Sequence, residues 1–192
     1  MIRNNLAKLM IDRGITATKL FNDTGIARST ISKISNNNTD KISLQTIDKL
    51  CYVLGVSPED FFDYIPYEVT VNVGFENYDS LSELENDNSI PISDWEEPIF
   101  LFVNVFHHGK KYSIEYQGTC LFSSEAFFKC SNININILHD EDNTSDIIYS
   151  WPVQFQNDFV SIVRERVQNY FDADPTDVDK NIILETLLGP IF

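Results

Sequence analysis

Residues 15–56 read ITATKLFNDTGIARSTISKISNNNTDKISLQTIDKLCYVLGV, and this stretch decides the fold of the first part of the chain. Its apolar residues recur at helical spacing, which predicts amphipathic helices around a small core. These residues are Leu20, Ile26, Ile31, Ile34, Leu44, Ile47, Leu50 and Leu54. Gly25 stands between two of the helical segments, where a tight turn needs a left-handed backbone that glycine adopts without a Cβ penalty. We therefore expect two helices joined by a short turn, the second with a polar outer face.

Extended to its neighbours, the same periodicity predicts an all-α domain of five helices over residues 1–65. Thr16 is the expected N-cap of the second helix. Ser57 as N-cap, Pro58 in the first turn and Asp60 in the capping-box position predict a short fifth helix after Gly55. The expected ranges of the first four helices are Ile2–Arg13, Ala17–Asp23, Arg28–Ser35 and Leu44–Leu54.

These features resemble the phage-repressor and Cro family of helix-turn-helix domains, of the xenobiotic-response-element type, over roughly residues 1–65. The resemblance implies that the segment Arg28–Ser35 lies in the major groove of double-stranded DNA and presents its N-terminal residues to base edges. It implies no catalytic residues and no cofactor. The residues expected to bind DNA are Thr16, Thr18, Lys19, Arg28, Ser29, Thr30, Ser32, Lys33, Asn37 and Asn38.

The chemistry of these side chains suits the expected positions. Arg28 can donate two parallel hydrogen bonds to guanine O6 and N7. Ser29 and Thr30 can reach bases or phosphates, and Lys33 can reach either as well. Thr16, Thr18 and Lys19 would clamp phosphate at the second helix's N-terminus, where free N–H groups attract anions. Asn37 and Asn38 belong to a polar loop that the family places close to the DNA backbone.

Two residues depart from the family pattern. Ala27 occupies the position that usually holds a Ser or Thr cap for the recognition helix, and losing such a cap costs about 1 kcal/mol. Phe21 occupies a position that is usually alanine, so its ring must be repacked or partly exposed.

Charge is unevenly distributed along the 192 residues, whose formal net charge is −15. Residues 1–65 contain 8 Lys and Arg against 7 Asp and Glu, whereas residues 66–192 contain 6 against 22. Within residues 1–34 the balance is 6 to 2, which places the positive charge on the helix-turn-helix. The asymmetry predicts two domains: a DNA-binding domain over 1–65, and an acidic domain over 66–192 for dimerisation, signal reception or protein binding.

Past Pro66 the apolar residues alternate, as they do in strands. We expect strands at Tyr67–Phe75, Ile99–Phe106, Tyr112–Phe122, Ile133–Ile137 and Ile147–Val153, with a short helix near Leu81–Leu84 in the acidic loop. Helical spacing returns over Phe155–Phe171 and Val178–Leu188. The second domain is therefore predicted to be an α+β unit, an antiparallel sheet with C-terminal helices.

Chemistry-bearing clusters are weak in this sequence. His107 and His108 are neighbours without a third metal ligand nearby, and the acidic run from Asp140 to Asp146 lacks the glycine and terminal Glu of a calcium loop. Cys51, Cys120 and Cys130 contain no CxxC pair, which favours buried thiols in a reducing compartment over a zinc site. We expect no enzyme, no bound metal and no cofactor.

The first residues do not have the pattern of a signal peptide, and no apolar run approaches the length of a membrane span. The expected localisation is cytoplasmic, with no membrane partner.

The leading hypothesis is a sequence-specific, autoregulatory transcription repressor of phage or mobile-element type that binds an inverted-repeat operator as a homodimer. A first alternative is an anti-CRISPR protein, with an acidic C-terminal domain that inhibits a Cas nuclease and a helix-turn-helix that represses its own promoter. A second alternative is the antitoxin of a toxin–antitoxin pair. In both alternatives residues 66–192 would bind a basic protein partner such as a nuclease or a toxin.

Overall fold

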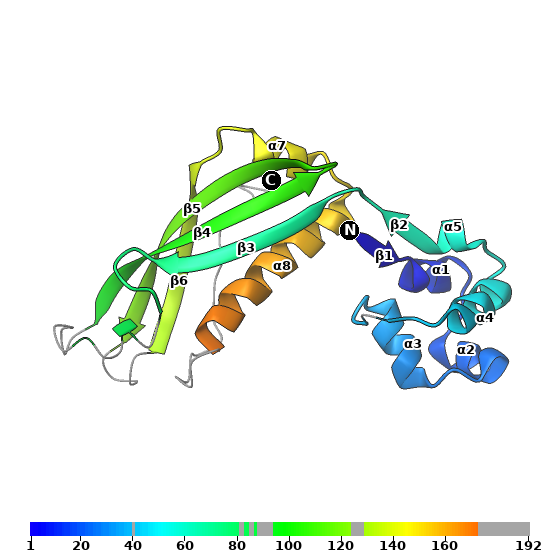
Figure 1. The fold of residues 1–192 in the computed structure, drawn as a ribbon. Coiled ribbons are helices and arrows are strands. Elements are labelled where there is room, and N and C mark those ends of the chain that lie inside the picture. Colours follow the sequence, from blue (N-terminus) through cyan, green and yellow to red (C-terminus); the bar gives the residue numbers. More distant parts are fainter. Residues whose placement is uncertain (40, 81–82, 85–86, 88–93, 124–128, 173–192) are drawn as a thin grey trace. The chain divides into compact units, whose positions relative to one another are not determined.

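The computed structural model of the chain describes residues 1–39, 41–80, 83–84, 87, 94–123 and 129–172 (Figure 1). The chain divides into two compact units, Met1–Pro66 and Tyr67–Phe192. The elements of the N-terminal unit are β1 (Ile2–Asn4), α1 (Leu6–Asp12), α2 (Ala17–Thr24), α3 (Arg28–Ser35), α4 (Leu44–Leu54), α5 (Pro58–Phe61) and β2 (Phe62–Tyr64). Those of the C-terminal unit are β3 (Glu68–Phe75), β4 (Trp95–His107), β5 (Lys110–Ser123), β6 (Lys129–His139), α7 (Thr144–Tyr149) and α8 (Val153–Asp172).

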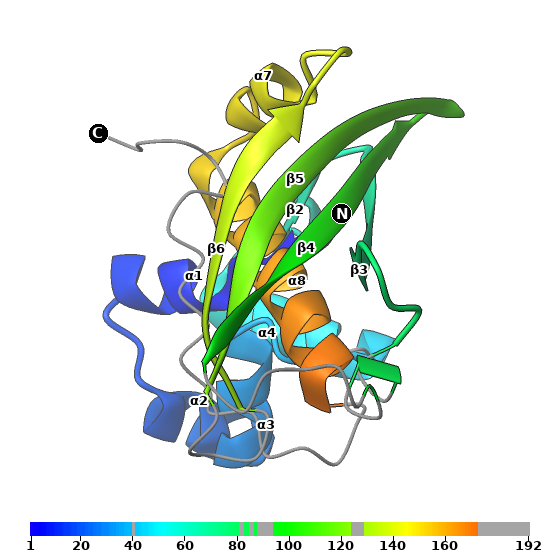
Figure 2. The same cartoon turned by 90° about the vertical axis from the view of Figure 1, so that its left-hand side faces the viewer.

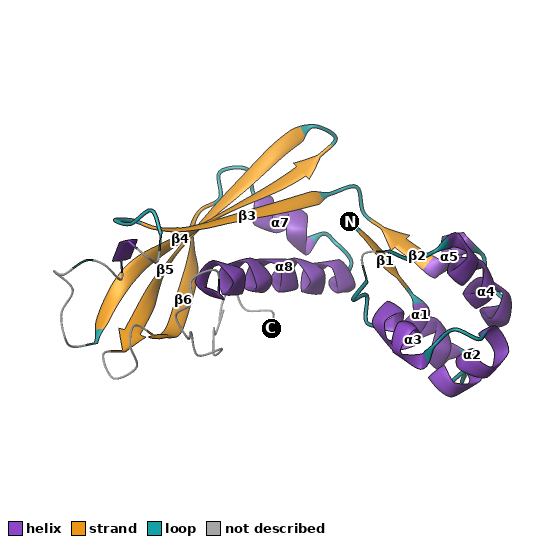
Figure 3. Cartoon of the chain, turned by 60° about the horizontal axis from the view of Figure 1, so that its bottom comes forward, coloured by secondary structure: helices purple, strands orange, loops and turns teal. Residues whose placement is uncertain are grey.

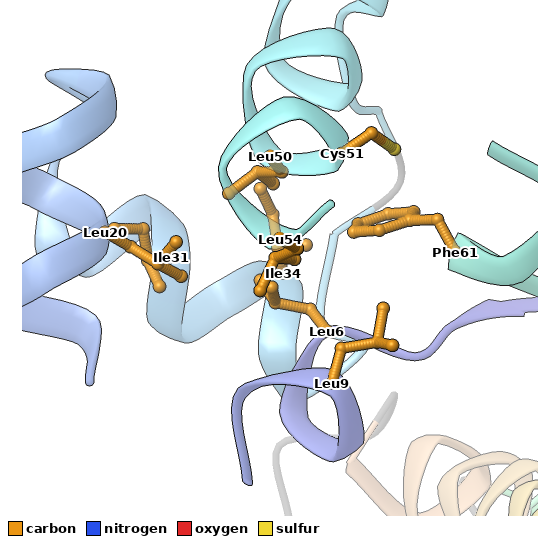
Figure 4. Close-up of a cluster of buried hydrophobic side chains, with 9 residues drawn as sticks. All are labelled: Leu6, Leu9, Leu20, Ile31, Ile34, Leu50, Cys51, Leu54 and Phe61. Atoms are coloured by element: carbon orange, nitrogen blue, oxygen red, sulfur yellow. The ribbon is translucent and has the colours of Figure 1, made fainter. Parts of the chain in front are cut away.

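Every helix of the N-terminal unit contributes apolar side chains to one core. Figure 4 shows these side chains gathered between the helices, with Leu20 of α2 against Ile31 of α3. All are at most 8 % exposed, so each buried Leu, Ile or Phe adds roughly 1.5–3 kcal/mol of hydrophobic stabilisation. The buried set is Leu6, Leu9, Leu20, Ile31, Ile34, Leu50, Cys51, Leu54 and Phe61.

Local signals fix where these helices begin and end. The Thr16 hydroxyl accepts the Lys19 N–H at 3.2 Å, which confirms Thr16 as the N-cap of α2. Gly25 and Gly55 end α2 and α4 in the left-handed conformation, with φ of 71° and 63°. The expected ranges of α3 and α4 are confirmed residue for residue.

The expectation of an all-α domain with five helices is wrong. Over residues 1–66, residue 40 aside, four helices have 7 to 11 residues, whereas α5 is a single four-residue turn that leads directly into a strand. The segment Ile2–Asn4, expected to open the first helix, is strand β1 and pairs antiparallel with β2. Asn4 explains the difference, because its Oδ1 accepts the Leu6 N–H at 3.0 Å and the helix starts only beyond it.

The four strands described in the C-terminal unit form an antiparallel sheet in the order β3-β4-β5-β6, and Figure 2 shows them side by side in that order. His108 and Gly109 form the turn between β4 and β5 with φ of 48° and 80°, the positive values of a two-residue hairpin turn. One side of the sheet holds fully buried side chains, such as Leu101 and Val103 of β4. α8 lies along the sheet (Figure 3) and buries one stripe of side chains. That stripe is Phe155, Phe159, Val163, Val167 and Phe171.

The expected strand at Ile147–Val153 is also wrong, since Thr144–Tyr149 forms helix α7. The Asp140 carboxylate accepts the N–H groups of Thr144 at 2.6 Å and Ser145 at 2.9 Å, which fixes the start of this helix. Burial opposes ionisation of Asp140, but the hydrogen bonds from Ser145 and Thr144 outweigh it and hold the pKa below the usual value. The expected helix at Val178–Leu188 lies outside the described residues, and that at Leu81–Leu84 lies partly outside them.

The cysteines do not all behave as the sequence suggested. Cys51 is a buried free thiol whose pKa is raised by burial and by the nearby carboxylates of Asp48 and Asp60. Cys120 is fully buried on β5 and is disulfide-bonded, so the expectation of three reduced thiols is wrong for this residue. In the described part of the chain no helix has both the length and the apolar character needed to cross a membrane.

Candidate nucleic-acid interface

The turn between α2 and α3 is held by the last residue of α2. The Thr24 hydroxyl donates to the carbonyl of Leu20 and accepts the Ile26 N–H at 3.1 Å. The Gly25 N–H bonds the Phe21 carbonyl at 2.8 Å, closing the helix end. Sequence reasoning identified Gly25 but missed Thr24, whose position at the end of a helix just before a glycine is the only local signal of this role.

This turn presents a polar side of α3 outward. Ile31 and Ile34 are at most 2 % exposed and face the core. Ser29 and Lys33, one turn apart, lie on the opposite side of the helix and are exposed. The remaining residues expected to bind DNA from this helix, Arg28, Thr30 and Ser32, are exposed beside that line.

Positive charge on this side is available to an incoming anion. Lys19, Arg28 and Lys33 are all exposed, and within the described residues none of them pairs with a carboxylate. The Arg28 guanidinium instead lies over the ring of Phe21, 5.3 Å from its centroid. Unpaired cations can replace the counterions of the DNA backbone, so this side suits a phosphate polyanion.

At the start of α2, one polar side chain caps the helix and two others are exposed to solvent. The Thr16 side chain is engaged in capping the helix, as the bond to Lys19 shows. Thr18 and Lys19 are exposed in the first turn. A helix start with exposed hydroxyl and ammonium groups can hold a backbone phosphate.

The loop after α3 is tied to β1 through Asn37. Its Oδ1 accepts from the backbone N–H and from the side-chain Nδ2 of Asn4, both at 2.7 Å, and its Nδ2 donates to the Asn4 carbonyl at 3.1 Å. Asn37 also has a φ of 53°, a conformation that asparagine tolerates better than most residues. The neighbouring Asn38 is exposed. The side chain of Asn37 thus has a structural contact that the sequence did not indicate.

The first residue of α3 follows an uncapped turn. Ala27 precedes the helix and contributes no side-chain hydrogen bond to it, as its chemistry requires. Arg28 therefore starts a helix whose N-terminal N–H groups receive no side-chain acceptor from the N-cap position.

Taken together, two short helices at a glycine turn, with an exposed cationic second helix, define a helix-turn-helix DNA-binding domain. In agreement, residues 5–67 match the family model of the Cro/C1-type HTH DNA-binding domain, which supports a DNA-binding transcription regulator. No family model matches the C-terminal unit, and no curated protein matches the chain.

The C-terminal unit offers little chemistry in its described part. No group of three or more His, Cys, Asp or Glu side chains there, or elsewhere among the described residues, is arranged to hold a metal ion. Asp140, part of the acidic run, is committed to the start of α7. The exposed side chains of His139 and Glu141 lie against each other, with Nε2 and Oε1 3.0 Å apart.

Proposed function

We propose that this protein is a sequence-specific transcription repressor of phage or mobile-element type, which reads DNA with the exposed side of α3. The observation that carries the proposal is the set of three exposed, unpaired cations, Lys19, Arg28 and Lys33, on a Cro/C1-type helix-turn-helix. Arg28 supplies the bidentate geometry that recognises guanine, and Lys33 supplies a point charge for base or phosphate.

The proposed operator is an inverted repeat bound by a homodimer. One helix-turn-helix reads only a half-site, and two half-sites lie about one helical turn, ~34–36 Å, apart. In this proposal residues 66–192 join two copies or receive the signal that releases DNA. Their 22 acidic residues against 6 basic ones repel the phosphate backbone, which keeps this part of the chain off the operator.

The test is a gel shift with the full-length protein on the DNA upstream of its own gene. Replacing Arg28 and Lys33 together by alanine should abolish specific retention of this DNA. The matched control replaces Arg164 and Arg166, two exposed cations of α8, and so removes the same charge from the other unit. This control variant should bind like the wild type.

Either of two results would reject the proposal. Equal binding by the Arg28/Lys33 variant would show that α3 does not read the groove. Equal weakening by both double variants would show that net charge, rather than the position of the cations, governs retention.

A second candidate function is suggested by the acidity of residues 66–192 alone. In this alternative the acidic unit binds a basic protein, such as a nuclease or a toxin, and DNA binding only controls expression of the gene. A complex held by charge would dissociate steeply as salt rises from low to physiological concentration. Recovery of no basic partner by the full-length protein at low salt would reject this alternative.

A further inference from the structure

Phe21 is an aromatic residue on the exposed side of α2, outside the core of the N-terminal unit. Its side chain is 40 % exposed and does not belong to the core cluster or to the residues packed against it. Packing in the core therefore does not explain a phenylalanine at this position on α2.

The ring of Phe21 instead carries the guanidinium of Arg28. The Arg28 Cζ atom lies 5.3 Å from the ring centroid, within the range over which the negative face of an aromatic ring attracts a cation. The two residues come from the two helices of the motif, and the turn around Gly25 brings them together.

From this contact we propose that Phe21 is a positioning residue for base recognition: its ring holds Arg28 ready for guanine before DNA arrives. The proposal rests on the proposed function, in which Arg28 reads a base. A free arginine side chain samples many rotamers, and ordering it at binding reduces affinity. A side chain already held over a ring has less freedom left to lose.

The kind of contact matters as much as its presence. A carboxylate partner would occupy the N–H groups that guanine O6 and N7 need. An aromatic ring instead attracts the cation through its face, and it accepts none of the in-plane hydrogen bonds that a carboxylate would take. Arg28 is thus restrained without losing the donors that its recognition role requires.

The contact involves the first residue of the recognition helix. Arg28 is the first residue of α3, and Ala27 gives the helix start no hydrogen bond. Among the described residues, the Phe21 ring is the partner against which the Arg28 side chain lies.

The experiment uses full-length protein and a duplex selected by the wild type from a randomised library. Binding is measured by fluorescence anisotropy on this duplex and on copies with each base pair replaced in turn. The base pair at which Arg28→Ala loses discrimination is the one that Arg28 reads. Phe21→Ala should bind the selected duplex roughly two- to fivefold more weakly and lose discrimination at that same base pair.

Two further variants separate the effect of the aromatic face of Phe21 from the effect of its volume. Phe21→Leu keeps an apolar side chain without an aromatic face and should behave like Phe21→Ala, whereas Phe21→Tyr should bind like the wild type. Tyr52→Ala removes an aromatic residue of the same unit that is 86 % exposed, and should change nothing. In an Arg28→Ala background the effect of Phe21→Ala should disappear.

A readout without DNA completes the test. In the free wild-type protein, ring current should move the Arg28 side-chain NMR signals upfield relative to Phe21→Leu. Wild-type discrimination by Phe21→Leu, or a loss spread evenly over all base pairs, would overturn the positioning role while leaving DNA binding intact. Unchanged discrimination in Arg28→Ala would instead overturn base reading by Arg28, and the role of Phe21 with it.

Discussion

The helix ends of the N-terminal unit and the sheet of the C-terminal unit depend on hydrogen bonds of different reach along the chain. In the N-terminal unit, caps and turns connect residues two to four apart, such as Thr16 with Lys19 and Ser57 with Asp60. In the C-terminal unit, the sheet pairs residues such as Phe75 with Ile99, or Ile99 with Gly118. A helix cap can be read within a few residues of sequence, whereas alternating apolar residues predict a strand but not the strand it pairs with.

The units differ in surface as well. The N-terminal unit exposes cations on one side of α3, whereas residues 66–192 carry most of the negative charge of the chain. A cationic surface is readily interpreted because DNA is its obvious ligand. An acidic surface is compatible with solubility, with a basic partner or with both, so it indicates less about function.

Among substitutions that test the difference between the two units, the largest loss of stability is expected in the core of the C-terminal unit. Phe159 is fully buried on α8, and Phe159→Ala should lower the free energy of unfolding of this unit by about 3–5 kcal/mol through the cavity left behind. Val153→Ala, on the same helix but 67 % exposed, should stay within about 0.5 kcal/mol of the wild type. Both tryptophans, Trp95 and Trp151, lie in this unit, so urea unfolding followed by their fluorescence reports it selectively.

Hydrogen exchange of peptides from residues 1–66 measures whether the same substitution also changes the stability of the N-terminal unit. Because this unit has its own core, Phe159→Ala should leave its protection unchanged. Equal loss of protection in both units would show one cooperative structure and remove the contrast between them.

A smaller effect is expected at Asn37, where sequence and structure suggest different roles. Asn37→Ala should destabilise the N-terminal unit by about 1–3 kcal/mol, because the polar groups of Asn4 lose their partners. Glycine tolerates the positive φ at this position, so Asn37→Gly removes the hydrogen bonds without adding backbone strain. Asn38→Ala, at the exposed neighbouring residue, is the control. Thermal unfolding followed by circular dichroism measures all three variants. Wild-type stability in Asn37→Ala would leave this asparagine only its expected contact with DNA.

The smallest effect concerns acid and Asp140. Its pKa is lowered in the folded state, so its stabilisation is complete above the unfolded value and is lost as pH falls through the folded one. Asp140→Asn should therefore cost up to about 1 kcal/mol at pH 7, and this difference should shrink as the pH falls below 3.8. Asp142→Asn is the neighbouring control. Urea unfolding midpoints of the wild type and Asp140→Asn, measured at pH 7 and at a pH below 3.8, test this prediction. An equal difference in stability at both pH values would contradict it.

The sequence predicted those elements whose ends are set by residues close to them in the chain. α3 and α4 match their expected ranges because capping residues and glycines flank regular apolar spacing. The spacing of Ile2, Leu6 and Leu9 also fits a helix, yet Ile2 belongs to β1, which pairs with residues about sixty positions later. The segment Ile147–Val153 is expected to be a strand, but its first residues belong to α7, whose start is fixed by the carboxylate of Asp140.

The same division applies to the candidate site. The sequence by itself determined the exposed cations of α2 and α3, the glycine turn between them and the missing cap at Ala27, because side-chain periodicity and backbone preferences act within a few residues. Only the tertiary structure decided that Arg28 lies over Phe21, that Asn37 is held by Asn4 and that Cys120 is disulfide-bonded. The Arg28–Phe21 and Asn37–Asn4 contacts each join separate elements, and their meeting depends on how the helices pack around the core.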